Sequence, residues 1–236
     1  MPEYRAAIDP FLPLAYTAGI WSSEQQAQQW VDVVATLAKR RRNTSGSMPL
    51  VDLRLFAATL VLYAFGLGTV VGRRPRQLGV LVGKIVDFGD GSFALGDRLN
   101  IAAVMTDGGA DLFELLPAYQ NKRLPGNELI ADVLRPLSKY ELRDADAFDA
   151  EMARLELAMA FGYAERMGKE RSGDWFWAPP GRFVLNRHLR ESLLAAWRTD
   201  HLTRALLCEV CVMAALAQPP RFGEVQGYFN RAGVMF

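Results

Sequence analysis

The chain has few of the side chains that most metal and redox sites use, with only two cysteines and two histidines among 236 residues. Its 27 basic and 26 acidic residues leave a formal net charge of +1. Such a chain has no overall field to attract nucleic acid or acidic lipid, so nucleic acid is not an expected partner. Scarce cysteine and the lack of a secretory leader are typical of a reducing compartment, and we expect a cytoplasmic protein of bacterial type.

Recognisable catalytic motifs are also missing. The sequence contains no phosphate-binding P-loop, no H-E-x-x-H and no G-x-S-x-G. Gly66-x-Gly68-x-x-x-Gly72 misses the dinucleotide fingerprint and follows a helix-like run. We therefore predict binding without catalysis, with no cofactor, no metal and no assigned catalytic residue. An enzyme that uses carboxylates stays open, with Asp144, Asp146 and Asp149 as its candidates.

Two spacings resemble metal sites and are better explained otherwise. Cys208-x-x-Cys211 lies inside an expected helix, and His201 is seven residues, or about 10 Å, away from Cys208, too far to share one zinc ion. Asp144-x-Asp146-x-x-Asp149 lacks the glycine and the final glutamate of a calcium loop. We expect buried structural thiols in the first case and acidic residues that stabilise a helix N-terminus in the second.

Half of the residues are hydrophobic, and most recur with helical spacing. Ser23 followed by Gln26 predicts a capping box that starts a helix over Glu24–Arg40. A long helix is expected from Ala147 to Met167, and Asp200 is expected to cap the last one. The turn signal Gly89-Asp90-Gly91-Ser92 predicts a small hairpin within residues 84–95. The fold class is thus mostly α, an irregular multi-helix array with one small hairpin.

A polar segment with glycine and serine, Asn43–Pro49, divides the chain. We expect an N-terminal helical segment over residues 1–42 and a main helical domain over residues 50–236. One continuous domain is the alternative.

Residues 55–72 form a run of eighteen positions without a charge. As a helix this run is about 27 Å long, just short of a hydrocarbon core about 30 Å thick. Its three glycines favour a buried helix over Leu53–Phe65, followed by a glycine-mediated turn or close packing site. A protein inserted in the membrane through residues 55–72 is the alternative.

An aromatic loop is the main candidate for partner binding, because tryptophan is enriched among interface hot spots. Packing of this loop between helices is the alternative. The candidate residues are Trp175, Phe176, Trp177, Pro179 and Pro180.

Two basic clusters predict a phosphate-binding patch if they meet in space. Solvated helix ends are the alternative. The candidate anion-binding residues are Arg40, Arg41, Arg42, Arg73, Arg74 and Arg76.

Three segments together carry a family resemblance: Leu60-Val61-Leu62-Tyr63-Ala64-Phe65-Gly66, Asp149-x-x-Met152-x-Arg154-Leu155-Glu156, and Pro180-Gly181-Arg182-Phe183. In this order they resemble the helical C-terminal region of large bacterial multidomain proteins of the Schlafen AlbA or sirtuin-like type. Val184-Leu185-Asn186 stands where those proteins have an aromatic residue. The resemblance implies an accessory or sensing role, with antiviral defence as one setting, and carries over no catalytic residue.

These observations predict a non-catalytic helical protein–protein interaction or sensor module. Its expected partner is another protein or the other domains of a larger assembly, and a homo-oligomer stays open. A small-ligand sensor would require a pocket in the structure.

Overall fold

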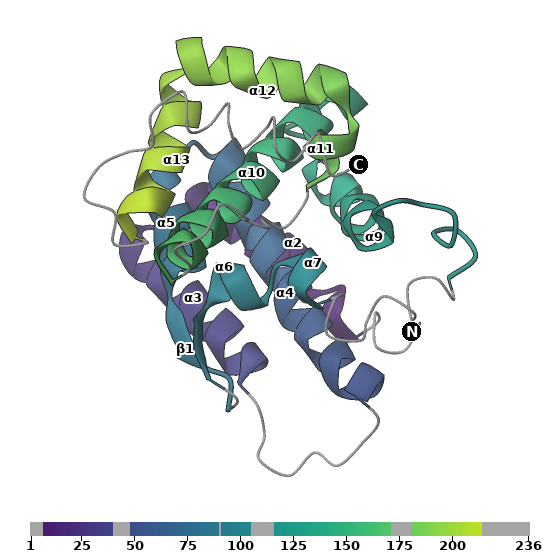
Figure 1. Cartoon of the computed structure of the whole chain (residues 1–236), viewed down its shortest axis with the longest axis vertical. Helices are drawn as coiled ribbons and strands as arrows, with labels where there is room; N and C mark the ends of the chain where they lie inside the picture. The colour runs from purple at the N-terminus through teal and green to yellow at the C-terminus, as the bar shows by residue number, and fades with distance from the viewer. Residues whose placement is uncertain (1–6, 40–47, 90, 105–115, 171–180, 214–236) are drawn as a thin grey trace.

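The computed structural model describes residues 7–39, 48–89, 91–104, 116–170 and 181–213, and most of these are helical (Figure 1). The predicted mostly α fold is confirmed. The helices are α2 (Phe11–Trp21), α3 (Glu24–Ala38), α4 (Met48–Val71), α5 (Pro75–Gly83), α6 (Leu95–Arg98), α7 (Ile101–Val104), α9 (Pro125–Leu134), the 3-10 helix η2 (Arg135–Ser138), α10 (Ala145–Glu170), α11 (Arg182–Leu185), α12 (Arg187–Thr199) and α13 (His201–Met213).

The predicted hairpin is also confirmed. Strand β1 (Ile85–Asp87) pairs antiparallel with β2 (Ser92–Ala94), with Val86 opposite Phe93. The Asp87 carboxylate accepts a hydrogen bond of 2.8 Å from the backbone N–H of Gly89, whose φ of 88° suits glycine.

Helix α4 is the centre of the molecule, and α10 crosses it in Figure 1. The side chains of residues 60–65 are at most 1% exposed. The helix continues past Phe65 to Val71, so the expected turn at the glycines is wrong, and the alternative of a close packing site applies. Within the described residues, no helix has the length and apolar character needed to cross a membrane.

Glycines let α2 and α4 touch through their backbones. A Cβ on Gly68 would lie 2.1 Å from the carbonyl oxygen of Tyr16, and one on Gly19 would lie 2.3 Å from that of Phe65. No side chain fits at either position, because real Cβ atoms do not approach other atoms so closely. The crossing therefore fixes the position of α2 on the central helix.

The predicted helix starts are capped as the sequence indicates. Ser23 Oγ accepts a hydrogen bond from the Gln26 backbone, and the Gln26 side chain accepts one from the Ser23 backbone. Asp200 accepts hydrogen bonds from the backbone N–H groups of Leu202 and Thr203 at 3.0 and 3.1 Å. These caps stabilise α3 and α13.

A single hydrophobic core joins the N-terminal and C-terminal helices. Leu12 of α2, Phe65 of α4, Leu81 of α5, Leu155 of α10 and Leu206 of α13 all belong to it. In Figure 1, α12 lies across the top of the view and α13 descends beside α5 and α10.

Candidate functional site

The outer face of α2 exposes large apolar side chains. Phe11 is 52% exposed, Leu14 60% and Trp21 73%. At 100° per residue these three positions fall within an arc of about 80°, opposite the buried face. The buried face consists of Leu12, Ala15, Tyr16, Gly19 and Ile20.

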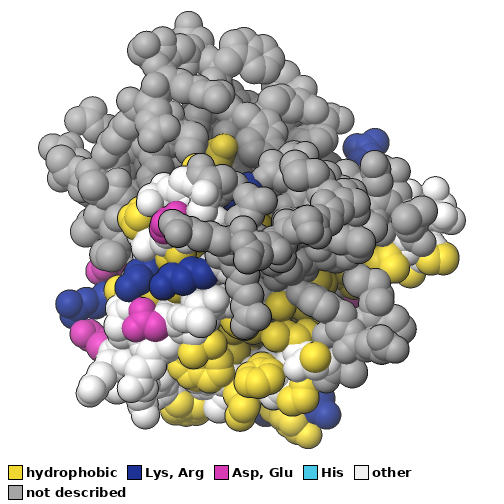
Figure 2. Space-filling view, turned by 90° about the horizontal axis from the view of Figure 1, so that it is seen from below, with side chains coloured by type: hydrophobic (Ala, Val, Ile, Leu, Met, Phe, Trp, Pro, Cys, Tyr) yellow, Lys and Arg dark blue, Asp and Glu magenta, His cyan; other side chains and the backbone are white. Residues whose placement is uncertain are grey.

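Helix α2 has no charged side chain, and its only hydroxyls are those of Thr17 and of Tyr16, which donates to Glu141 at 3.3 Å, so this helix is largely apolar on both faces. A helix that is apolar all round is normally buried, and exposed apolar patches mark sites of association. Helix α3 also exposes apolar side chains, Val33 and Leu37, which are 44% and 41% exposed and lie one turn apart. Figure 2 shows hydrophobic side chains gathered over the lower part of the face that it presents.

The end of α2 beside Trp21 is firmly attached to the region where α5 begins. The carbonyl oxygen of Ser22 accepts hydrogen bonds from Arg74 Nη1 at 2.8 Å and from Gln77 Nε2 at 2.9 Å. Gln77 is only 6% exposed. Together with the glycine crossing, these bonds hold the outer face of α2 in one position.

The predicted basic patch is only partly described. Arg73 pairs with Glu151 at 3.2 Å and Arg76 with Glu24 at 2.9 Å, while Arg74 donates to Ser22 as above. Each of these three arginines thus has a partner within the protein. Residues 40–42 lie outside the described residues, so the patch stays a prediction.

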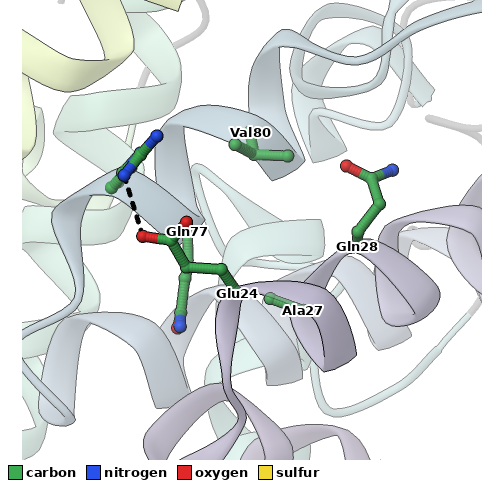
Figure 3. Close-up of a pocket in the computed structure, with 6 residues that line it drawn as sticks. Glu24, Ala27, Gln28, Gln77 and Val80 are labelled. Carbon is green, nitrogen blue, oxygen red and sulfur yellow. Dashed lines mark hydrogen bonds and ion pairs between the residues drawn. The ribbon is translucent and has the colours of Figure 1, made fainter.

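A hollow of about 140 Å³ lies between α3 and α5 (Figure 3). Ala27 and Val80 supply its apolar surface, and the ion pair between Arg76 and Glu24 borders it. Because the two charged residues of its lining neutralise each other, this hollow offers no net charge to a ligand. Gln28 and Gln77 complete the lining.

The other predicted sites cannot be placed. The aromatic residues 175–177 and the prolines at 179 and 180 lie outside the described residues. Cys208 and Cys211 lie on α13, but their side chains are outside the described part of the structure. Among the residues that the structure does describe, no group of three or more His, Cys, Asp or Glu side chains is arranged to hold a metal ion.

A buried ionic cluster joins α9, α10 and α11. At its centre Glu156, 3% exposed, accepts hydrogen bonds from Asn127 Nδ2 at 2.9 Å and from the backbone N–H of Arg182 at 2.7 Å. Burial raises the pKa of the Glu156 carboxyl to about 7, although both donors act in the opposite direction. Burial and the Glu156 charge also raise the pKa of Tyr63 on α4.

Arg182 links the cluster together. Its Nη1 donates to Asp149 at 3.0 Å and its Nε to Glu128 at 3.3 Å. Burial lowers the pKa of this guanidinium, but the neighbouring carboxylates outweigh that effect and raise it overall. Gly181 allows the close approach, since a Cβ there would lie 2.8 Å from that of Glu156. The start of α11 is thereby fastened to α9 and α10.

A second hollow, of about 190 Å³, adjoins this cluster. Arg135 connects the two, because its Nη2 donates at 3.0 Å to Asp149 Oδ1, the same atom that accepts from Arg182. The lining residues are Arg135, Ser138, Lys139, Leu142, Arg143, Asp144, Ala145 and Phe148.

The three predicted catalytic carboxylates have different environments. Asp144 accepts a hydrogen bond of 2.6 Å from the Ala147 backbone and so caps α10, as the sequence interpretation held. Asp146 is exposed in the first turn, and Asp149 belongs to the ionic cluster. Sequence reasoning missed Glu156 as a candidate. The available signal was a charged residue four positions after Met152, on the apolar face of the long helix.

No protein-family model, curated protein or solved structure matches this chain.

Proposed function

We propose that the chain is a helical protein–protein interaction module that binds its partner through the outer face of α2. The observation that carries the proposal is the exposure of Phe11, Leu14 and Trp21 on one stripe of a helix that is apolar all round. Fully burying a large apolar side chain gains about 1.5–3 kcal/mol. Covering this stripe would therefore supply a substantial part of a binding energy.

The rigidity of α2 also favours binding. Its backbone is fixed by the crossing at Gly19 and Gly68, and its end by the hydrogen bonds to Ser22. A surface that is already ordered loses little conformational entropy when a partner docks on it. Trp21 is the expected anchor, because tryptophan is enriched among interface hot spots.

The partner is another protein, or the other domains of a larger assembly, with a complementary apolar surface. The accessory role implied by the sequence resemblance, with antiviral defence as one setting, belongs to the same proposal. The Trp175–Pro180 loop is a second proposed contact surface.

Capture of binding proteins from the native host tests the proposal. A Leu14→Gln/Trp21→Gln double variant is expected to recover at least tenfold less partner than the parent chain. Ile85→Gln is the matched control, because Ile85 is a large apolar residue that is 59% exposed and lies on β1, which pairs with β2. It should recover as much partner as the parent.

Circular dichroism should be unchanged in both variants, since all three side chains are exposed. Sedimentation velocity of the purified parent identifies a second copy of the chain as the partner if the mass doubles with concentration. Equal recovery of the same proteins by the parent and the double variant would refute the proposed role of α2.

A further inference from the structure

We propose that the hollow between η2 and the start of α10 binds a compact oxyanion of the phosphate type. This site is separate from the partner-binding face of α2 and does not depend on it. It would give the module a small-ligand sensing function in addition to protein binding.

The lining of the hollow is strongly cationic. It contains three basic side chains, Arg135, Lys139 and Arg143, and one carboxylate, Asp144. That carboxylate already accepts a hydrogen bond from the Ala147 backbone. Within the described part of the chain, neither Lys139 nor Arg143 forms an ion pair with a carboxylate, and the Lys139 ammonium lies 4.7 Å from the centre of the Tyr140 ring. With three basic side chains and one carboxylate, the lining carries a formal net charge of +2.

The guanidinium of Arg135 is held in place before any ligand arrives. Its Nη2 is bonded to Asp149, and its central carbon lies 4.4 Å from the ring centre of Phe148, a buried residue. Its Nη1 is buried and has no hydrogen-bond partner among the described residues. Because this Nη1 is buried, it cannot donate to a ligand in the open hollow, and Arg135 contributes a positive charge held at the edge of the hollow.

The N-terminus of α10 is not the source of the attraction for an anion. Asp144 already caps that helix end, so its free N–H groups and dipole are partly satisfied. The attraction comes from the three side chains. Because a phosphate group carries about −1.5 to −2 charges at pH 7, it matches the excess positive charge better than a single carboxylate does.

The hollow is small and partly open to solvent. At about 190 Å³ it has room for roughly six water molecules. It is smaller than the ~300–1,000 Å³ typical of pockets for drug-sized ligands. A free phosphate ion or the phosphate group of a small ester fits this volume.

Isothermal titration calorimetry at constant ionic strength tests the site, with inorganic phosphate and glycerol phosphate as the two probes and sodium chloride as the reference. The parent chain should bind one equivalent of at least one probe and show no chloride binding. Preference for inorganic phosphate would identify the free ion as the ligand, and preference for glycerol phosphate would identify an ester.

Lys139→Gln/Arg143→Gln is the test variant, since both side chains are exposed and the substitutions should leave the fold intact. Lys122→Gln/Arg123→Gln removes the same charge from exposed positions outside the hollow. The test variant should bind the probe at least tenfold more weakly, and the control within twofold of the parent. The inference is overturned if neither probe binds, or if the two variants weaken binding equally.

Discussion

The carboxylate of Glu156 accepts a hydrogen bond of 2.7 Å from the backbone N–H of Arg182, which fastens the start of α11 to the middle of α10. The Arg182 side chain reaches Asp149 and Glu128 from the same position. One residue thus joins α9, α10 and α11 through both its backbone and its side chain. Helix α12 begins directly after this attachment, and α13 follows α12.

Glu156 should make stability depend on pH. Its pKa is about 7 in the folded chain and 4.5 in the reference state, so between these values the folded chain keeps a proton that the unfolded chain loses. The free energy of unfolding should therefore fall as pH rises from 4.5 to 7, by up to about 1.4 kcal/mol per pH unit, and then level off. Glu156→Gln should remove this slope, as measured by urea unfolding at several pH values.

The glutamine in this variant is expected to fit, because the Asn127 amide can turn to offer its oxygen in place of its nitrogen. Glu191→Gln is the matched control, since Glu191 is exposed and its pKa is lowered by Arg187. If the parent and Glu156→Gln show the same dependence on pH between 4.5 and 7, the carboxyl does not hold its proton as inferred.

Arg182→Lys should destabilise the chain although it keeps the charge. The guanidinium of Arg182 bonds Asp149 and Glu128 through two different nitrogens, and a lysine ammonium has only one. One of these partly buried carboxylates therefore loses its partner in the variant. The expected loss in the free energy of unfolding is about 1–3 kcal/mol. Arg187→Lys, at an exposed ion pair, should cause no measurable change. Equal effects of the two substitutions would contradict the role assigned to Arg182.

Replacement by alanine should change the stability of the chain differently at two neighbouring glycines of α4. At Gly68 the added Cβ meets the Tyr16 backbone, which cannot move aside, and overpacking of this kind costs about 1–3 kcal/mol. At Gly66 it meets the end of the Leu155 side chain at 2.9 Å, which can turn away, and alanine adds helix propensity. Thermal unfolding should therefore show a large loss for Gly68→Ala and little for Gly66→Ala. The reverse order would contradict the described crossing.

Local signals in the sequence predict much of this fold. The capping box at Ser23, the cap at Asp200 and the turn signal at Gly89 each act over a few residues, and the structure confirms all three. The course of α4 past Phe65 was missed. Glycine propensity argues for a break there, whereas close contact between the α4 and α2 backbones makes glycine necessary within the helix.

The ionic cluster around Glu156 is harder to predict because its residues are far apart in the sequence. Asn127, Asp149, Glu156 and Arg182 meet only when α9, α10 and α11 pack together. The sequence shows that α2 is an apolar segment, but it does not show which side of the helix is buried. Apolar residues on both sides of a helix predict that the whole helix is buried, and only the structure shows that one side of α2 is exposed.

Photo-cross-linking from the outer face of α2 is the most direct test of its role. A photoreactive phenylalanine analogue would replace Leu14, Trp21 or, as a control, Ile85, in the full chain produced in its native host. Positions 14 and 21 should cross-link to one and the same protein, identified by mass spectrometry, while position 85 should not. If positions 14 and 21 yield no more product than position 85, the outer face of α2 is not the surface at which a partner binds.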